Sequence, residues 1–508
     1  MSTATPPKAM SAELRGLVKP GHYIAGAWNE NGDSQIEVLD PSTETVLAEL
    51  PLGRPADIDA AVAAARDAFD NGPWPRMSPR ERSAILARLA ELVGTHLDEL
   101  AELGVFEIGS PITLSRALHA GAPIQFLEYW SDMALKGPHG RYSEGLPIQD
   151  GPLLAANHLF QEPVGVVATV IAYNYPLMLI SFKVAAALAA GCTVVLMPSP
   201  RAPLSSLAFT RIAEEAGIPP GVVNLVIGGA DAGQTLTEHP DVDMVSFTGS
   251  VKVGRQVMVQ AAHGLKRVVL ELGGKSPNIV LPGANVSETV GPSILRFTRN
   301  SGQGCGATTR VLLPRGDVER FNDEARSFMQ GLKVGDPWDE DTDVGPLIRR
   351  EQVEFVKGFV DRALDAGATT VAQSADPATD KGFFFTPMLV GDVSNDAEIC
   401  QEELFGPVGA VVPYDTVDEA IKLANQSRYG LNATVWGPTD EAMRVAMRLR
   451  SGTVALNGGG PERPDAPWSG WGESSVGAER GEAGFAEFFQ VKHVHWPLAG
   501  VGKPPGSR

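Results

Sequence analysis

The chain has 508 residues, of which 43% are hydrophobic and 20% charged, as is typical of folded globular proteins. This length exceeds one ordinary core and predicts two or three domains. The formal net charge of −19 argues against a nucleic-acid partner, because a phosphate-binding face needs a basic surplus. The three widely spaced cysteines, Cys192, Cys305 and Cys400, indicate neither a disulfide framework nor a zinc site, and they suit a reducing cytoplasm.

The N-terminal region shows no apolar segment of the kind that a secretory signal needs, and we expect residues 1 to about 19 to form a loose tail. Residues 23–51 predict short strands with polar turns between them. An amphipathic helix begins at Pro55. Ser78 starts a capping box for a second helix, which we expect to run towards Leu103.

From Pro163 onward, strands alternate with helices, which implies βαβ units and parallel sheets that bind ligands at the carboxyl ends of their strands. The first series has strands at 164–171, 193–196, 222–227, 244–247 and 268–270 and helices at 177–190, 205–216 and 251–263. The second has strands at 277–280, 310–313, 409–412 and 433–435 and helices at 318–329, 351–366, 417–427 and 441–449. The predicted fold class is therefore α/β, with two doubly wound domains and an active site in the cleft between them.

One apolar run, Pro176 to Pro198, approaches the length of a membrane span. Lys183 lies inside it, and Gly191 divides a helix-like half from a β-branched half. We therefore expect a buried helix followed by a buried strand rather than a membrane helix.

The chemistry-bearing residues are Cys305, Glu271 and Asn174. Cys305 stands among Gly302, Gly304 and Gly306, and glycines let a substrate or backbone approach closely. A cysteine taken alone is more often a buried structural residue. Together with a carboxylate and an amide donor, however, it forms a set suited to acyl transfer.

Five stretches resemble the motifs of the NAD(P)-dependent aldehyde dehydrogenase superfamily. They are Asn174 in YNYPL, FTGS at 247–250, ELGGKSP at 271–277, GQGC at 302–305 and EELFGPV at 402–408. They occur in the family's order, and the resemblance extends from about Pro20 to His495.

The resemblance implies a Rossmann-like cofactor domain formed by residues 1–135 and 158–272 and a catalytic domain formed by residues 273–486. A small β extension for oligomerisation would comprise residues 136–157 and 487–508. It also implies a cytoplasmic homodimer or homotetramer that acts on a small aldehyde, with no nucleic-acid or membrane partner and no metal.

The same resemblance assigns catalytic roles to three residues. The Cys305 thiolate would add to the aldehyde carbon, and local dipoles or the bound cofactor would lower its pKa. Asn174 and the Cys305 backbone N–H would bind the oxyanion. After hydride transfer leaves a thioester, Glu271 would activate water, and a partly buried position would suit this base by raising its pKa.

The cofactor is expected to be NAD, with NADP as an alternative. Gly249 and Ser250 begin a predicted helix, whose N-terminal N–H groups can hold a pyrophosphate. The residues expected to contact the cofactor are Ile171, Ala172, Tyr173, Lys183, Ser199, Gly229, Gly249, Ser250, Gly254, Leu272, Gln352, Glu403 and Phe405.

Two departures from the family pattern affect these expectations. Met197 and Pro200 replace a lysine and a glutamate that contact the adenosine ribose in relatives, and the adjacent Arg201 either binds a 2′-phosphate or points into solvent. Near the C-terminus, PWSGWGESSVG replaces a Gly-rich stretch and puts Trp468 and Trp471 near the cleft.

The substrate is expected to be a medium-chain, terpenoid or aromatic aldehyde. The residues that fall in channel-lining helices by resemblance are largely apolar or aromatic: Phe126, Tyr129, Trp130, Tyr175, Met178 and Phe182. Some of them could merely fill the core. Two rival functions remain: a CoA-acylating dehydrogenase, disfavoured by Glu271, and a non-catalytic protein with an impaired cofactor site.

Overall fold

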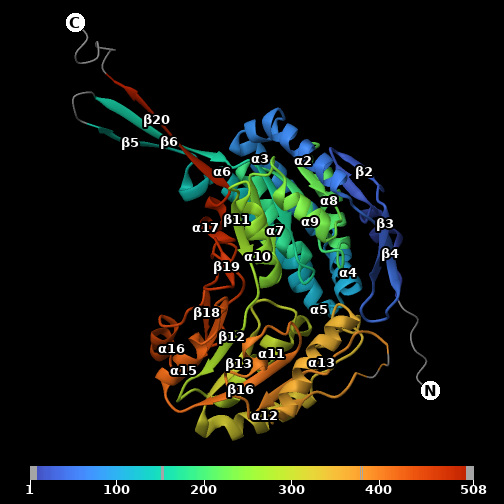
Figure 1. Ribbon diagram of the computed structural model, residues 1–508, viewed down its shortest axis with the longest axis vertical. Coiled ribbons are helices and arrows are strands. Elements are labelled where there is room, and N and C mark those ends of the chain that lie inside the picture. The colour runs from blue at the N-terminus through green and yellow to red at the C-terminus, as the bar shows by residue number, and fades with distance from the viewer. Residues whose placement is uncertain (1–7, 150–153, 378, 380, 499–508) are drawn as a thin grey trace.

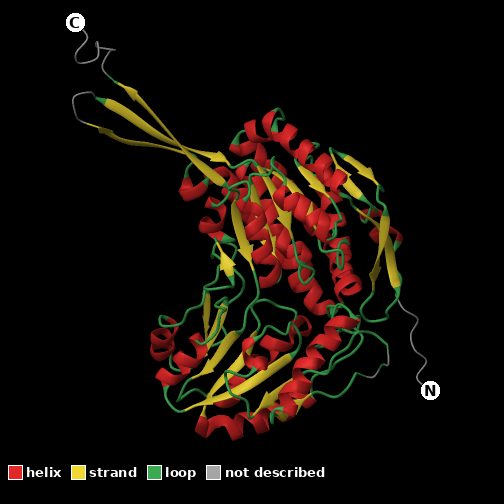
Figure 2. Cartoon of the chain, in the orientation of Figure 1, coloured by secondary structure: helices red, strands yellow, loops and turns green. Residues whose placement is uncertain are grey.

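The computed structural model describes residues 8–149, 154–377, 379 and 381–498. Two largely parallel sheets form the body of the molecule, and helices pack around them (Figures 1 and 2). The strands are apolar on both faces, so each sheet has hydrophobic clusters on both sides. In β7, for example, Val166 packs in one cluster and Val167 in the other. The predicted α/β class is confirmed.

The first sheet has the order β19-β11-β10-β7-β8-β9-β1-β2. Strands β11, β10, β7, β8 and β9 are parallel, whereas β19, β1 and β2 are antiparallel to their neighbours. The strand bounds are Ser475–Val476, Arg267–Glu271, Met244–Thr248, Val166–Val170, Thr193–Met197, Val223–Leu225, His22–Ile24 and Ala27–Asn29, in sheet order. The chain order reverses between β10 and β7, which is the switch point where such sheets bind ligands.

The second sheet has the order β14-β15-β16-β13-β12-β17-β18, and only β14 is antiparallel to its neighbour. The bounds are Thr369–Gln373, Met388–Gly391, Val408–Tyr414, Thr308–Pro314, Ser276–Val280, Asn432–Trp436 and Thr453–Leu456. Strand β11 of the first sheet ends at Glu271, and β12 of the second sheet begins at Ser276. The amino end of the second sheet therefore follows closely on the carboxyl end of the first.

The helices that surround the first sheet are α2 (Pro55–Asp70), α3 (Pro79–Thr95), α4 (Leu97–Ile108), α6 (Ala122–Lys136), α7 (Pro176–Ala190), α8 (Leu204–Glu215), α9 (Ala230–Glu238) and α10 (Val251–Ala262). Those of the second are α11 (Val286–Thr298), α12 (Val318–Gln330), α13 (Arg350–Asp365), α15 (Val417–Asn425) and α16 (Thr439–Ala446). Short helices complete the chain: α1 (Ala12–Leu17), α5 (Ile112–Leu114), α14 (Glu398–Gln401) and α17 (Gly481–Ala486).

Two predictions for the N-terminal third are wrong in part. The expected loose tail contains the helix α1, capped by Ser11, because Leu14 is fully buried against the core. Residues 1–7 lie outside the described part. The helix expected to run from Ser78 towards Leu103 is two helices, because His96 leaves helical geometry with ψ of 24°. The capping box that begins at Ser78 is present as predicted.

The long apolar run folds as predicted into a buried helix and a buried strand, α7 and β8. Gly191 ends α7 in the left-handed conformation, with φ of 97°. Among the described residues, no helix is both long enough and apolar enough to cross a membrane.

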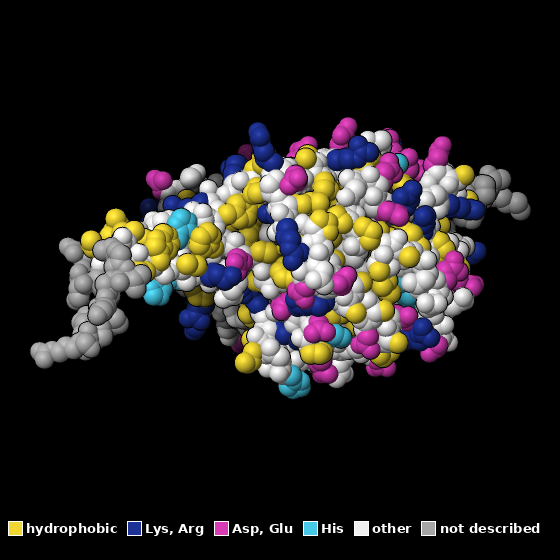
Figure 3. Space-filling model, turned by 90° about the horizontal axis from the view of Figure 1, so that it is seen from above, with side chains coloured by type: hydrophobic (Ala, Val, Ile, Leu, Met, Phe, Trp, Pro, Cys, Tyr) yellow, Lys and Arg dark blue, Asp and Glu magenta, His cyan; other side chains and the backbone are white. Residues whose placement is uncertain are grey.

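A three-stranded sheet, β20-β6-β5, extends away from the body as an arm (Figure 1). Its strands span Phe489–Pro497, Ala155–Pro163 and Ser143–Gln149. Apolar side chains stay exposed on it and gather at one end of the molecule in Figure 3: Leu146, Ile148, Phe160, Val491, Val494 and Trp496. The arm includes much of the predicted extension; residues 150–153 and 499–508 lie outside the described part. The predicted domain boundaries stay a prediction, although β19 joins the first sheet from within the segment expected to be catalytic.

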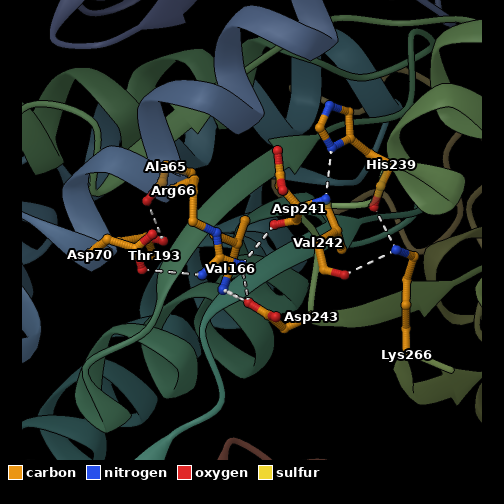
Figure 4. Close-up of polar contacts among 10 residues, drawn as sticks. All are labelled: Ala65, Arg66, Asp70, Val166, Thr193, His239, Asp241, Val242, Asp243 and Lys266. Carbon is orange, nitrogen blue, oxygen red and sulfur yellow. Dashed lines mark hydrogen bonds and ion pairs between the residues drawn. The ribbon is translucent and has the colours of Figure 1, made fainter. Parts of the chain in front are cut away.

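A polar cluster ties helix α2 to the amino ends of β7 and β10 (Figure 4). Arg66 pairs with Asp243 and with Asp70, and Asp243 also accepts a bond from the Val166 N–H at 2.8 Å. Lys266 donates to two backbone carbonyls of the loop before β10. These contacts hold the sheet at the end opposite to the carboxyl ends of its parallel strands. A separate hairpin, β3 (Ser34–Leu39) with β4 (Val46–Leu52), matches the predicted short strands.

Candidate active site

A cavity of about 670 Å³ lies at the carboxyl ends of β7, β8 and β10, on both sides of the switch point. This volume is in the range of small-molecule and cofactor sites. Helix α10 begins at the cavity with Ser250 as its N-cap, whose hydroxyl accepts from the Val253 N–H. Gly249 lies in the lining, and a Cβ there would be 2.5 Å from the Phe247 ring. The cavity thus presents a helix N-terminus, the backbone feature that binds phosphates.

Most residues predicted to contact the cofactor line this cavity. They are Ile171, Ala172, Tyr173, Ser199, Gly229, Gly249, Ser250, Leu272, Gln352, Glu403 and Phe405. Cys305 and Asn174 line it as well. The cavity therefore gathers residues that are more than 200 positions apart in the sequence.

Lys183 and Gly254 do not line the cavity. The Lys183 ammonium group is fully buried, pairs with Glu479 and donates to the Ser246 hydroxyl at 3.2 Å. It lies on α7, which is apolar on all sides, so no pattern in the sequence predicts where its side chain points. Gly254 lets α10 approach Leu272, where a Cβ would be only 2.5 Å from the leucine side chain. Their assignment to the cofactor stays a prediction, and the structure gives both a packing role.

The loop before Cys305 has an unusual backbone. Asn300, Ser301 and Gly302 all have positive φ, at 50°, 57° and 73°. At Gly302 a Cβ would lie 2.2 Å from the backbone of Gly406, so only glycine fits against the EELFGPV stretch. Strained backbone of this kind is typical of functional sites, where surrounding contacts hold it in place.

Amide side chains fix this loop. Asn174 donates to the carbonyl of Gln303 at 2.9 Å, and Asn300 donates back to the carbonyl of Asn174 at 3.1 Å. Gln303 is fully buried and accepts from the Ile348 N–H at 3.0 Å, while Asn432 donates to the Gly306 carbonyl at 2.9 Å. Asn174 therefore lies directly against the cysteine loop, and one hydrogen of its NH₂ group is not used by the Gln303 bond.

Cys305 is half-buried as a residue, with its thiol in the cavity. Burial raises the pKa of the thiol to about 12, and the neighbouring Glu403 and Glu271 carboxyl groups add to this effect. In the protein without cofactor, burial and negative charge outweigh the backbone N–H of Gly306, so local dipoles alone do not lower this pKa; the lowering by the bound cofactor stays a prediction.

Glu271 is buried at the end of β11, and neither of its oxygens has a hydrogen-bond partner among the described residues. Burial first, and then repulsion from Glu479, raise its pKa well above the usual range, while Lys183 and Arg480 oppose the rise. Glu403 is similar: burial raises its pKa to about 7, although it accepts from the Gly274 N–H at 3.0 Å. A buried carboxyl group without partners is suited to accept a proton.

Comparison with known proteins agrees with this geometry. Residues 28–494 match the model of the aldehyde dehydrogenase family. The chain belongs to the aldehyde dehydrogenase family. It is 38% identical over 477 residues to a 3-succinoylsemialdehyde-pyridine dehydrogenase of a Pseudomonas species, covering 93% of this chain and 97% of that relative.

Solved structures of the family are similar along nearly the whole chain. A variant of aldehyde dehydrogenase C from Pseudomonas syringae, in complex with NAD+ and octanal, is 36% identical with a TM-score of 0.89, and the match covers 96% of this chain and 98% of that one. An aldehyde dehydrogenase of Mycobacterium tuberculosis in complex with NAD+ is 38% identical with a TM-score of 0.89, covering 93% and 97%. The resemblance predicted from the five motifs is confirmed.

Within this member of the family, the departures have clear structural positions. Met197 packs on the glycines beneath it, since a Cβ at Gly228 or Gly233 would lie 3.0 Å from its side chain. Arg201 lines the cavity, with its guanidinium carbon 5.4 Å from the Tyr173 ring, so it does not simply point into solvent.

Of the two tryptophans, Trp471 is exposed and Trp468 lies near the cysteine loop. Glu473, in the same stretch, bridges Arg255 and Arg428.

Several lining residues were not predicted. They lie on single faces of α9 and α10: Gly233, Gln234, Thr237, Val253, Gln256, Val257 and Gln260. Their spacing of three or four residues is a helical signal that could have identified the α10 face, whereas α9 was not expected at all. Glu479 and Arg480 were also missed, because adjacent charged residues usually mark a solvated surface.

Proposed function

We propose that the protein oxidises an aldehyde to a carboxylic acid with NAD, using Cys305 as the nucleophile. The observation that carries this proposal is that Cys305, Asn174 and most of the predicted cofactor residues line one cavity at a helix N-terminus. The family relationship and the NAD+ complexes of the two solved relatives support it.

The cavity fits a dinucleotide. The hydroxyl of Thr248 lines it, is buried and has no partner among the described residues, so it is free to bind a ligand oxygen. A Cβ added to Gly229 would meet only one side-chain atom, at 3.8 Å, which leaves room for a flat ring system. Gly249 and Ser250 would hold the pyrophosphate at the start of α10. When bound, the dinucleotide supplies the acceptor for a hydride.

Cys305 and Asn174 would act on the aldehyde together. The thiolate adds to the carbonyl carbon, and the carbonyl oxygen becomes an oxyanion. The remaining N–H of the Asn174 side chain and the Cys305 backbone N–H would donate to this oxygen. Because Gln303 and Asn300 already fix Asn174, the donor is positioned before the substrate arrives.

Glu271 would serve the second half of the reaction. After the hydride leaves, an acyl thioester remains on Cys305. The unpartnered, buried carboxylate of Glu271 would take a proton from water, and the resulting hydroxide would attack the thioester and release the acid. The raised pKa makes Glu271 a stronger base than an exposed glutamate, once it is ionised.

The choice of cofactor rests on Met197 and Arg201. Met197 offers the ribose hydroxyls no charge and no N–H. Arg201 offers a guanidinium at the cavity wall, and it favours NADP as an alternative. Titration of the purified protein with both dinucleotides decides between them. NAD binding tighter by about tenfold or more, a difference of roughly 1.4 kcal/mol, would discard NADP. If Arg201→Ala weakens the binding of NADP but leaves that of NAD unchanged, NADP is the favoured cofactor.

The experiment that tests the function is product analysis. The purified chain, an aldehyde and NAD or NADP should give the free acid at the same rate with and without coenzyme A. A coenzyme A thioester as product would favour the acylating rival, which Glu271 disfavours. Absence of any product with either dinucleotide would contradict the proposal.

We also propose that the chain forms a homo-oligomer through the arm β20-β6-β5. The apolar side chains exposed there, such as Ile148 and Trp496, cost free energy in water and suit a second copy. Both outer strands of the arm have an open edge among the described residues. Light scattering of the intact chain should give a dimer or tetramer, and Trp496→Glu should shift it towards monomer; a monomeric intact chain would contradict this.

The free thiols of Cys192, Cys305 and Cys400 suit a reducing compartment, and we propose the cytoplasm. Fractionation of cells that express the chain tests this location, and recovery outside the cytoplasm would contradict it.

A further inference from the structure

A buried arginine, Arg480, packs on a tryptophan that also lies against the cysteine loop, and it is not among the residues that line the dinucleotide cavity. Arg480 immediately precedes α17, and only 6% of its side chain is exposed. Its backbone has φ of 60° and ψ of 169°, which residues other than glycine rarely adopt. Strain of this kind persists where a side chain must be held in one position, as at functional sites.

The guanidinium of Arg480 packs on three aromatic rings. Its central carbon lies 4.9 Å from the ring centre of Trp468, 5.4 Å from that of Phe182 and 5.8 Å from that of Phe126. Trp468 connects the arginine to the thiol, because a Cβ at Gly306, the residue after Cys305, would lie 3.1 Å from the Trp468 ring. Arg480 and the cysteine loop therefore lie against the same tryptophan ring.

The hydrogen-bonding capacity of Arg480 is only partly used. A guanidinium has five N–H donors. One donates to Glu462 at 2.6 Å, and the side chain of Glu462 is 52% exposed. The Nε–H group is buried and has no partner among the described residues. Since a buried donor without a partner is unfavourable, an anion that enters here would gain a charge-assisted bond.

Other charged groups lie in the same region as Glu462. Burial and Arg299 lower the pKa of Arg296, and Glu462 raises it. Arg299 and Glu462 also act on Tyr175: burial raises the pKa of this phenol to about 12, Arg299 opposes the rise, and Glu462 and Cys305 add to it. Arg480 thus pairs with Glu462 directly, and Arg296 is close enough to feel the charge of the same carboxylate.

We propose that Arg480 determines specificity and that the preferred substrates are aldehydes with a carboxylate at the far end. The carboxylate would take the place of Glu462 on the guanidinium, and the aromatic rings would pack along the carbon skeleton. This inference rests on the proposed function, because it names the substrate class of the same site. It departs from the uncharged apolar aldehyde that the aromatic residues alone predict.

Matched pairs of aldehydes test the inference on the purified full-length enzyme. One pair is 4-carboxybenzaldehyde and 4-methylbenzaldehyde, and the other is 4-oxobutanoate and butanal. Because a charge-assisted bond is strong, we expect kcat/KM to favour the carboxylate by about tenfold or more in at least one pair, mainly through KM.

Variants then assign the preference to Arg480. Arg480→Met keeps the apolar contacts but removes the charge, and it should lower the carboxylate-to-neutral ratio of kcat/KM by about tenfold or more. Arg480→Lys keeps the charge and should lower the ratio less. The matched control is Arg463→Met, since Arg463 is exposed and pairs with Asp465; this change should leave the ratio as it is.

A wild-type enzyme that prefers the neutral aldehyde of both pairs would overturn the inference, and no variant is needed for that result. An Arg480→Met variant that slows both members of a pair equally would also overturn it, because the arginine would then act through Glu271. If the enzyme oxidises none of the aldehydes with either dinucleotide, the proposed function itself is overturned. Failure of the proposed function can therefore be distinguished from failure of the inference about Arg480.

Discussion

The two sides of Cys305 are built differently. The cavity side is lined by glycines, apolar residues and several polar side chains such as Gln352 and Glu403, and it contains the backbone N–H groups at the start of α10. The other side contains aromatic rings and a group of buried or half-buried charges, with Arg480 held in strained geometry. The cavity side provides open volume and backbone N–H donors, and the other side provides aromatic and charged side chains.

This difference indicates separate tasks. A dinucleotide has a fixed shape and phosphate groups, so open space and N–H groups suit it. A substrate is distinguished by its functional groups, so charged and aromatic side chains suit it. Cys305 lies between the two sides, where both ligands would meet, and substitutions can therefore separate them.

The largest effect is expected from substitution of Cys305, which lies between the two sides. Cys305→Ala should lower aldehyde oxidation by roughly a thousandfold or more, because the nucleophile is lost. Dinucleotide binding should persist, since the cavity keeps its other lining residues. Steady-state kinetics measure the rate of aldehyde oxidation, and fluorescence titration measures dinucleotide binding. Cys192→Ala, at a buried thiol elsewhere, is the control; equal losses in both variants would contradict the role of Cys305.

Glu271→Gln should lower kcat by roughly a hundredfold or more, because general-base catalysis is removed. A pre-steady-state burst of reduced dinucleotide, about one per active site, should remain, as the thioester still forms. Loss of the burst would mean that Glu271 acts before or during hydride transfer, which would contradict its proposed role in thioester hydrolysis.

The pH dependence of the wild type follows from the same raised pKa values. The thiol of Cys305 and the carboxyl of Glu271 both act in their deprotonated forms, and burial raises both pKa values. Activity should therefore rise with pH from the neutral to the alkaline range. A pH–rate profile of kcat checks this, and a rate that falls as pH rises through this range would contradict it.

Asn174→Ala should lower kcat by roughly 100-fold, the usual effect of removing one oxyanion donor. Asn174 also holds the cysteine loop, so the control is Asn432→Ala, which removes a loop contact at Gly306 without removing the proposed oxyanion donor. Similar losses in both would mean that Asn174 is only structural.

The smallest effect is expected from a substitution that tests the role of the cavity side in dinucleotide binding. Gly229→Val would put a side chain into open space and should raise the KM for the dinucleotide by about tenfold. The KM for the aldehyde should change little, because Gly229 follows β9 of the first sheet, whereas Cys305 precedes β13 of the second. Gly316→Val, also in open space but outside the cavity lining, is the control. An effect on the aldehyde alone would reverse the assignment of the two sides.

Much of the fold could be predicted because its signals are local. Apolar runs such as Thr193–Met197 and helix signals such as the Ser78 capping box depend on neighbouring residues alone. The break at His96 and the two-residue strand Ser475–Val476 could not, since tertiary packing decides them.

The same distinction holds for the site. Cys305 and Gly249 stand in motifs with glycines that need close approach, so the sequence predicts their place in the cavity. Lys183 and Arg480 have no such signal, because the direction of a buried charge depends on partners such as Glu479 and Glu462 that only folding brings near. The pKa of Cys305 likewise depends on burial, which motifs do not report.

Trapping the acyl intermediate tests most directly whether Cys305 is the nucleophile. Glu271→Gln is mixed with NAD or NADP and an aldehyde, quenched during turnover and digested for peptide mass spectrometry. We expect the acyl group of the substrate on the peptide that contains Cys305, and none on those that contain Cys192 or Cys400. Reduced dinucleotide formed without any acylated Cys305 would contradict it.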